Sequence, residues 1–191
     1  MPRNIEIKAR IESIAALRPR AAAIATAGPT EIFQDDTFFA CPAGRLKLRA
    51  FPDGSGELIF YRRPEALGPK ESFYVRSPTA DPDSLRATLG LACGVTGRVV
   101  KQRTLFLVGR TRVHLDRVQG LGDFLELEVV LRDDEPTDLG MGEAQDLMAR
   151  LGIGGDQLVE GAYVDLLDAR GDPPAAEPPL PSRGTPSDTG G

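Results

Sequence analysis

Residues 3–10 read RNIEIKAR, and the alternation of polar and aliphatic residues in this stretch decides the fold class. Residues two apart in a β-strand share a face. Asn4, Glu6 and Lys8 therefore lie on one face, while both isoleucines lie on the other. The stretch predicts a strand with one charged face and one aliphatic face.

The same alternation recurs further along the chain, and there the charges are sorted by sign. In the stretch RLKLR, the basic residues Arg45, Lys47 and Arg49 oppose two leucines. In the stretch DFLELEVVL, Glu126 and Glu128 oppose aliphatic residues. Two further strands carry Lys101 with Arg103, and Arg112 with His114 and Asp116, on one face.

Turn residues such as those in PDGSG separate these segments and predict eight short strands. The predicted strands cover residues 3–10, 32–40, 45–51, 57–63, 70–77, 98–108, 111–118 and 124–131. Helical patterns cover about residues 13–27, 81–91, 141–151 and 156–168. Eight strands with short connections favour an antiparallel sheet that closes on itself. We therefore predict an α+β fold, a closed eight-stranded antiparallel β-barrel with flanking helices.

Two prolines bear on the helix predictions, one in favour of a helix and one against a regular helix. Asp81 is a good N-cap and Pro82 suits the first helical position, so both support the second helix. Pro19 lies inside the first helical pattern, where it lacks an N–H and crowds the preceding turn. We therefore expect a kinked or two-part helix there.

The sorted charges allow two interpretations. An ordinary half-exposed sheet would turn solvated charges outward. However, a solubility surface mixes both signs, whereas this chain groups basic residues on one strand and acidic residues on another. If the helices cover the aliphatic face throughout, the charged face is left on the concave side. A charged concavity is costly unless ions of opposite sign fill it, which indicates a polyanion site.

The residue types indicate what such a site would bind. Arginine and lysine on adjacent strands can hold a chain of phosphates, arginine through its planar fork and lysine as a point charge. Carboxylates in the same cavity would repel phosphate unless a hard cation such as Mg²⁺ or Mn²⁺ bridged them. The oxygen ligands would be Glu6, Asp116, Glu126 and Glu128.

Composition narrows the class of protein. The chain has 191 residues, 41% hydrophobic and 27% charged, and a net charge of −5, which gives no signal for nucleic acid. No apolar run approaches the ~20 residues of a membrane span, and the N-terminus lacks the features of a secretory signal. We expect a cytoplasmic protein with Cys41 and Cys93 reduced. Residues 1–170 form the predicted domain, and the Pro/Gly-rich residues 171–191 a disordered tail.

Three other features carry weaker signals. His114, the only histidine, lies between Arg112 and Asp116 on the charged face and serves either as a structural contact or as a hydrogen-bond donor to substrate. Tyr163 is interpreted as a packing aromatic on the last helix, and residues 34–39, QDDTFF, as the start of a strand.

The stretch NIEIK, residues 4–8, matches the second Glu and the Lys of an ExExK strand, with Asn4 at the first position. The stretches QDDTFF, GRLKLR, KQR, RVHLD and GLGDFLELE follow in order. This ordered set covers about residues 3–168 and resembles the CYTH or triphosphate tunnel metalloenzyme family, most closely its class IV adenylyl cyclase branch.

The resemblance implies an eight-stranded antiparallel tunnel that binds a triphosphate-bearing substrate with Mg²⁺ or Mn²⁺. It places the metal at Glu6, Glu126, Glu128 and Asp116. Together with the charged faces, it assigns catalysis to Lys8, Lys101 and Arg112. Substrate binding is assigned to Arg45, Lys47, Arg49, Lys70, Arg103 and His114.

Three functions remain open from the sequence. The first is conversion of ATP to 3′,5′-cyclic AMP and pyrophosphate. The second is hydrolysis of inorganic triphosphate, thiamine triphosphate or a nucleoside triphosphate. The third is a nucleotide or polyphosphate sensor without catalysis, because the uncharged Asn4 could weaken one metal position. Each is compatible with a homodimer.

Overall fold

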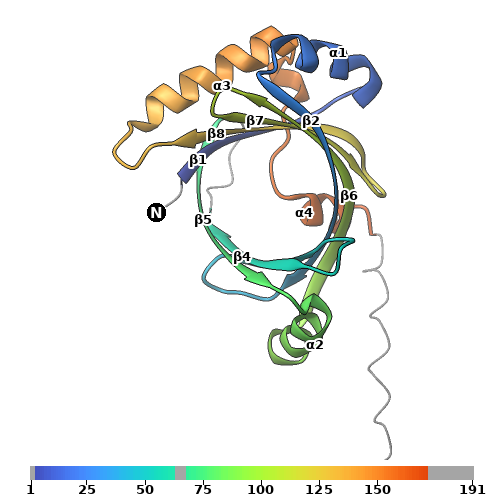
Figure 1. The fold of residues 1–191 in the computed structure, drawn as a ribbon. Coiled ribbons are helices and arrows are strands. Elements are labelled where there is room, and N and C mark those ends of the chain that lie inside the picture. The colour runs from blue at the N-terminus through green and yellow to red at the C-terminus, as the bar shows by residue number, and fades with distance from the viewer. Residues whose placement is uncertain (1–2, 63–67, 172–191) are drawn as a thin grey trace, which may run out of the picture.

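The computed structural model describes residues 3–62 and 68–171. Eight antiparallel strands close into a barrel in the order β1-β5-β4-β3-β2-β6-β7-β8, visible as a ring in Figure 1. The strands are β1 (Arg3–Arg10), β2 (Ala27–Phe39), β3 (Arg45–Ala50), β4 (Gly56–Arg62), β5 (Lys70–Thr79), β6 (Val95–Val108), β7 (Thr111–Val118) and β8 (Gly122–Leu131). The predicted α+β barrel is confirmed.

Four helices accompany the barrel: α1 (Ile14–Ile24), α2 (Pro82–Cys93), α3 (Thr137–Leu151) and α4 (Tyr163–Asp168). Asp81 caps α2 by accepting a hydrogen bond from the backbone N–H of Ser84, and Pro82 follows it, as predicted. Pro19 lies within one continuous α1, so the alternative of a two-part helix is wrong.

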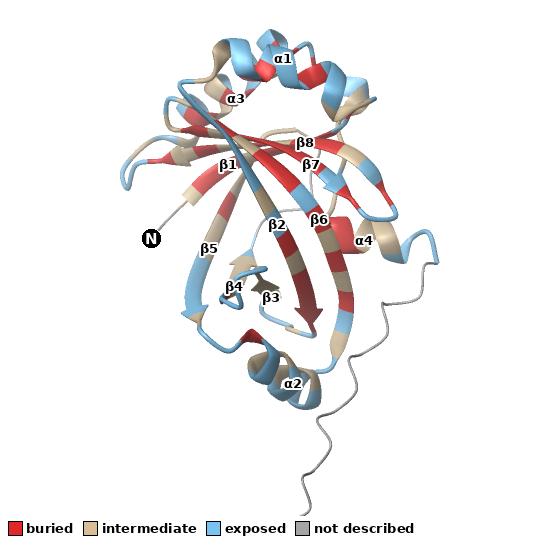
Figure 2. Ribbon diagram, turned by 45° about the vertical axis from the view of Figure 1, so that its right-hand side comes forward, coloured by how far each residue is buried: buried red, intermediate tan, exposed pale blue. Residues whose placement is uncertain are grey.

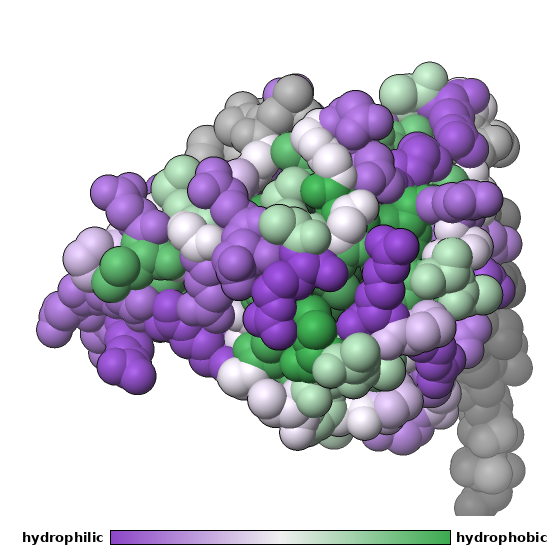
Figure 3. All heavy atoms as spheres, turned by 90° about the horizontal axis from the view of Figure 1, so that it is seen from above, coloured by the Kyte–Doolittle hydropathy of each residue, from purple (hydrophilic) through white to green (hydrophobic). Residues whose placement is uncertain are grey.

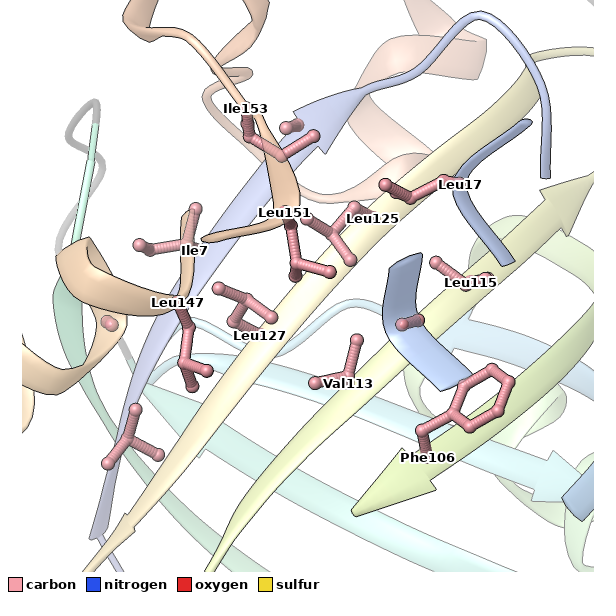
Figure 4. Packing of buried hydrophobic residues seen from close by; sticks show 14 of the residues in the cluster. Ile7, Leu17, Phe106, Val113, Leu115, Leu125, Leu127, Leu147, Leu151 and Ile153 are labelled. Atoms are coloured by element: carbon pink, nitrogen blue, oxygen red, sulfur yellow. The ribbon is translucent and has the colours of Figure 1, made fainter. Parts of the chain in front are cut away.

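The main hydrophobic core lies outside the barrel, between its wall and two helices. Helices α1 and α3 pack on the aliphatic face of β1, β7 and β8 (Figure 4). Ile7 and Leu127 from the wall and Leu147 from α3 belong to this cluster and are at most 2% exposed. Because these strands bury their aliphatic side chains outward, their charged side chains must point into the barrel.

The helices do not cover the whole barrel. Helix α2 contacts β2 and β3, yet Figure 2 shows that most of its own surface is exposed. On the outer wall, Phe33 of β2 is 46% exposed and Val75 of β5 is 49% exposed. The expectation that helices cover the aliphatic face throughout is therefore correct for β1, β7 and β8 and wrong for part of the opposite wall.

Strands β5 and β8 extend slightly beyond the predicted ranges, to Thr79 and from Gly122, and the largest extensions are in β2 and β6, which pair with each other. Strand β2 begins at Ala27, where residues 27–31 were assigned to the first helix or to a loop, and β6 begins at Val95. Their ladder extends from Ala27 opposite Leu107 to Phe39 opposite Val95. Helix α3 also begins earlier than the predicted residue 141, at Thr137. Residue 63 of the fourth predicted strand lies outside the described residues.

The predicted helix over residues 156–168 is wrong in its first half. A 3₁₀ turn (Gly155–Gln157) is followed by extended chain, in which Leu158 bridges to Ala9 and the Val159 N–H donates to the Lys8 carbonyl. Gly161 then adopts a φ of 80°, a conformation that favours glycine. Only residues 163–168 are α-helical, because the chain first pairs along β1.

Seen from above the helices α1 and α3, the surface mixes hydrophilic side chains with smaller hydrophobic areas (Figure 3). Across the described residues, every helix is too short or too polar to cross a membrane.

Candidate active site

The barrel encloses a cavity of about 310 Å³ to which all eight strands contribute side chains. Its lining contains every predicted site residue except Arg45 and Asp116. The residues that it brings together are Glu6, Lys8, Lys47, Arg49, Lys70, Lys101, Arg103, Arg112, His114, Glu126 and Glu128. The alternation that was read from the strands therefore places the charges inside the barrel, and the alternative of an outward solvated sheet is wrong for these residues.

One half of the basic lining is organised by Asp36, which sequence reasoning treated only as part of a strand. Asp36 is 2% exposed and accepts hydrogen bonds from Lys47 Nζ at 2.7 Å and from Arg49 Nε and Nη2 at 2.7 and 2.8 Å. It lies directly opposite Arg49 in the β2–β3 ladder. The available signal was parity: Asp36 shares the inward face with Gln34 and Phe38, which also line the cavity.

The other half has the same arrangement around Asp116. This carboxylate is fully buried and accepts from Lys101 Nζ at 2.9 Å and from two nitrogens of Arg103 at 2.6 Å. It lies directly opposite Arg103 in the β6–β7 ladder. Each lysine–arginine pair on one strand is thus held by an aspartate on its neighbour.

Burial and charge set the protonation states in these two clusters. Burial alone would raise the pKa of Asp36, but the charges of Arg49 and Lys47 hold it far below the usual range. Asp116 shows the same balance, with Arg103 and Lys101 lowering its pKa. Burial and the neighbouring Arg49 lower the pKa of Lys47 to about 8, although Asp36 opposes the shift. Both aspartates are therefore ionised at neutral pH.

Carboxylates and the histidine form a group that suits a divalent cation. Ligand atoms of His114, Glu126 and Glu128 lie within 4.8 Å of one another, and Glu6 is opposite Glu128 in the β1–β8 ladder. Burial would raise the pKa of Glu126, but Lys101 and the other nearby cations hold it well below its usual range. The donor set thus offers ionised carboxylate oxygens, which Mg²⁺ and Mn²⁺ prefer.

His114 is neutral in this group. Burial and the charge of Arg103 lower its pKa to about 4. Its Nδ1 lies 3.6 Å from an oxygen of Glu128 and has no hydrogen-bond partner within the described chain. An uncharged ring nitrogen beside two carboxylates can serve as an additional metal ligand or contact the substrate.

Tyr163 connects α4 to the charged cavity. Its hydroxyl donates to Asp116 at 3.1 Å, and its ring lies 4.0 Å from Lys8 Nζ and 4.9 Å from Lys101 Nζ. In Figure 1, α4 lies within the outline of the ring. Tyr163 packs as predicted, but it also lines the cavity, which a packing role alone would not require.

Arg45 lies outside the main cavity, although it shares a strand face with Lys47. Its guanidinium donates twice to Asp165 of α4, both at 2.8 Å. Asp165 also accepts from the Ala162 N–H at the start of α4. Arg45 borders a second hollow of about 570 Å³ between α4 and residues 40–46. The side chain of Arg45 therefore binds Asp165 of α4 and lies outside the main cavity.

Comparisons with known proteins agree with this geometry. The family model of the CYTH domain matches residues 2–163. Adenylate cyclase CyaB from Aeromonas hydrophila is 26% identical over 181 residues, covering 86% of this chain and 88% of that protein. The PH1012 structure from Pyrococcus horikoshii OT3 has a TM-score of 0.75 at 22% identity, covering 85% of this chain and 98% of that one.

A further structure is similar in fold. HpAC1 from Hippeastrum, a proposed adenylyl cyclase with a dominant triphosphatase activity, has a TM-score of 0.60 at 19% identity. The similarity covers 88% of this chain and 96% of that chain.

The match over most of its length shows that this chain belongs to the CYTH domain family. CYTH proteins are adenylate cyclases or triphosphatases that need a divalent metal, so the chain is an enzyme of one of these two classes.

Proposed function

We propose that the protein converts ATP to 3′,5′-cyclic AMP and pyrophosphate with Mg²⁺ or Mn²⁺, as a class IV-like adenylyl cyclase. The observation that supports a triphosphate substrate is the composition of the cavity lining. Two lysine–arginine pairs, each held by an aspartate, line the same cavity as a cluster of carboxylates. Similarity to adenylate cyclase CyaB supports ATP as the substrate.

The basic residues take the role of a phosphate clamp. Lys47 and Arg49 from β3 and Lys101 and Arg103 from β6 supply fixed positive charge, which stabilises phosphate oxygens through charge-assisted hydrogen bonds. Three further cations that line the cavity complete the clamp: Lys8, Lys70 and Arg112. Because Asp36 and Asp116 already hold the two pairs, the clamp needs little rearrangement to receive a triphosphate.

The cluster of carboxylates would hold the divalent metal cation. Glu6, Glu126 and Glu128 are the proposed ligands, with His114 beside them. When bound, the divalent metal would neutralise phosphate charge. We assign Asp116 to positioning of Lys101 and Arg103 instead of metal binding, because its contacts to both cations and to Tyr163 occupy it.

In the proposed reaction, the ribose 3′-hydroxyl loses its proton to water and its oxygen bonds to the α-phosphorus, while the bond from that phosphorus to the pyrophosphate oxygen breaks. The clamp would hold the triphosphate extended, so that the hydroxyl and the leaving group lie on opposite sides of the α-phosphorus. Lys8, Lys101 and Arg112 would stabilise the negative charge that develops on the phosphate oxygens and on the pyrophosphate. These roles retain the catalytic assignment of Lys8, Lys101 and Arg112.

The alternative is a triphosphatase that admits water in place of the ribose hydroxyl. A triphosphatase would use the same clamp and the same carboxylates. The dominant triphosphatase activity of the structurally similar HpAC1 supports this alternative. The substrate would then be inorganic triphosphate, thiamine triphosphate or a nucleoside triphosphate.

Product analysis separates the two activities. The protein is incubated with Mg²⁺ or Mn²⁺ and, in parallel, with ATP, thiamine triphosphate and inorganic triphosphate, and the products are separated by chromatography. Cyclic AMP with pyrophosphate supports the cyclase; orthophosphate with a diphosphate supports the triphosphatase. Glu126→Gln should abolish either reaction, whereas Asp53→Asn, in an exposed turn, should not. The absence of any product with metal present would overturn the proposal.

We also propose that the domain of residues 1–170 acts in the cytoplasm, that residues 171–191 are dispensable, and that the chain can form a homodimer. Sedimentation and activity of the full chain and of a chain ending at residue 170 test the last two points. A smaller oligomer or lower activity after truncation would contradict dispensability.

A further inference from the structure

Uncharged polar atoms without partners gather in this same cavity. Asn4 Oδ1, Gln34 Oε1 and Ser72 Oγ are buried and lack hydrogen-bond partners in the described part of the chain. Their residues are 2%, 4% and 1% exposed, and all three line the cavity. A buried polar atom without a partner costs free energy, so such atoms normally meet water or a ligand.

Asn4 and Ser72 belong to an uncharged row of the wall. Asn4 lies opposite Ser72 in the β1–β5 ladder and opposite Val130 in the β1–β8 ladder. Residues directly opposite share a face, so neither cross-strand neighbour of Asn4 is ionised. The next inward-facing row differs, because Glu6 lies between Lys70 and Glu128.

Gln34 lies on the other wall, but it is directly opposite Lys101 in the β2–β6 ladder, so its own row contains a cation. Three strands separate β1 from β2 in either direction around the barrel, so Asn4 and Gln34 face the cavity from opposite sides. Ile32, on the same strand face as Gln34, and Ile59 add apolar surface to the lining. The cavity therefore combines charged rows with a region of neutral hydrogen-bonding and apolar groups.

We propose that Asn4 and Ser72 form a neutral subsite that binds the uncharged, hydrogen-bonding organic part of the substrate, a nucleoside. This inference rests on the proposed function, since it assumes that the charged rows hold the triphosphate. Anionic phosphates and cations are stabilised by the charged rows, which leaves the neutral row for hydroxyl, amine and ring groups. An inorganic triphosphate has no such groups and would not use the subsite.

The test compares binding of ATP and inorganic triphosphate by calorimetry on the full chain. EDTA is present, which stops metal-dependent turnover and removes any role of Asn4 as a metal ligand. We expect Asn4→Ala and Ser72→Ala each to weaken ATP binding roughly three- to tenfold, the effect of one lost hydrogen bond. Affinity for inorganic triphosphate should stay within twofold.

Thr104→Ala is the matched control. Thr104 is equally buried, its hydroxyl donates to Glu31 at 2.9 Å, and it lies outside the cavity lining, so its loss should change neither affinity. Equal weakening of both ligands, no effect on ATP, or no ATP binding by the wild type would each overturn the subsite. Should Asn4→Ala fail to fold, Ser72→Ala decides. The proposed function fails separately, through the absence of products when metal is present.

Discussion

Asp36 carries no proposed contact with substrate, yet two cations of the clamp depend on it. In Asp36→Asn, Lys47 and Arg49 lose their buried counter-charge, and breaking a buried pair in this way costs about 3–5 kcal/mol. We expect the free energy of unfolding to fall by that amount, measured by urea denaturation in EDTA. The affinity for triphosphate should change as well, because the two cations lose their fixed positions.

The neighbouring residue provides the control. Asp35 faces outward and pairs with Arg98, whose side chain is 33% exposed. Partly exposed pairs contribute about 0–1 kcal/mol, so Asp35→Asn should be nearly neutral. Equal losses in the two variants would show that the burial of the Asp36 cluster does not matter.

Lys47 gives a pH prediction. Burial and Arg49 lower its pKa to about 8, with Asp36 and Lys101 as the other charges that act on it. The ammonium is present below that pH and is lost as the pH rises through it, so kcat/KM should fall by about tenfold or more between pH 7 and 9.5 in Mg²⁺. Lys47→Arg keeps its charge and should flatten this alkaline limb. An unchanged limb would assign the titration to another group.

At the scale of elements, α3 lies close against the barrel at Gly140. A Cβ at this position would lie 2.6 Å from Leu131 Cδ2 and 2.8 Å from Ile5 Cγ1. Gly140→Ala should therefore destabilise the protein by about 1–3 kcal/mol, as overpacking does. Gly142→Ala, on the same helix with open space around it, should instead stabilise by about 0.5–1 kcal/mol. Urea denaturation of both variants measures the difference; the same sign for both would contradict the packing argument.

The contact between Arg45 and Asp165 links β3 to α4, and it separates Arg45 from the clamp. In Arg45→Ala we expect faster hydrogen exchange at the α4 amides of Asp165 and Leu166. Affinity for inorganic triphosphate should fall less than threefold, compared with tenfold or more in Lys47→Ala. Comparable affinity losses would return Arg45 to the substrate-binding group.

Sequence patterns predicted the elements whose residues repeat regularly, and missed those that depend on distant partners. The two-residue alternation in β1, β3 and β8 was sufficient to place their charges in the cavity. The segment before α4 looked helical, but its pairing with Ala9 and the φ of Gly161 depend on tertiary structure. Parity alone could have placed Asp36 on the inward face, but its contacts with Lys47 and Arg49 depend on the pairing of β2 with β3.

For the molecule as a whole, charge is distributed unevenly between cavity and surface. The chain carries a net charge of −5, whereas the cavity lining contains eight basic and four acidic side chains among the described residues. The net charge of the sequence does not indicate a polyanion site; the alternation of charged and aliphatic residues along the strands does. The basic excess repels itself in the free protein and is neutralised when a polyanion binds.

A polyanion should therefore stabilise the whole fold. At 100 times its dissociation constant, a ligand of the native state adds about 2.7 kcal/mol, which corresponds to a rise in Tm of about 5–10 °C for a chain of this size. We expect inorganic triphosphate to produce this shift in EDTA, and orthophosphate at equal ionic strength to produce little. Arg103→Ala should reduce the shift, because Arg103 is the cation buried between Asp116 and Glu126. Equal shifts with the two phosphates would mean that the cavity responds to ionic strength and does not select a chain of phosphates.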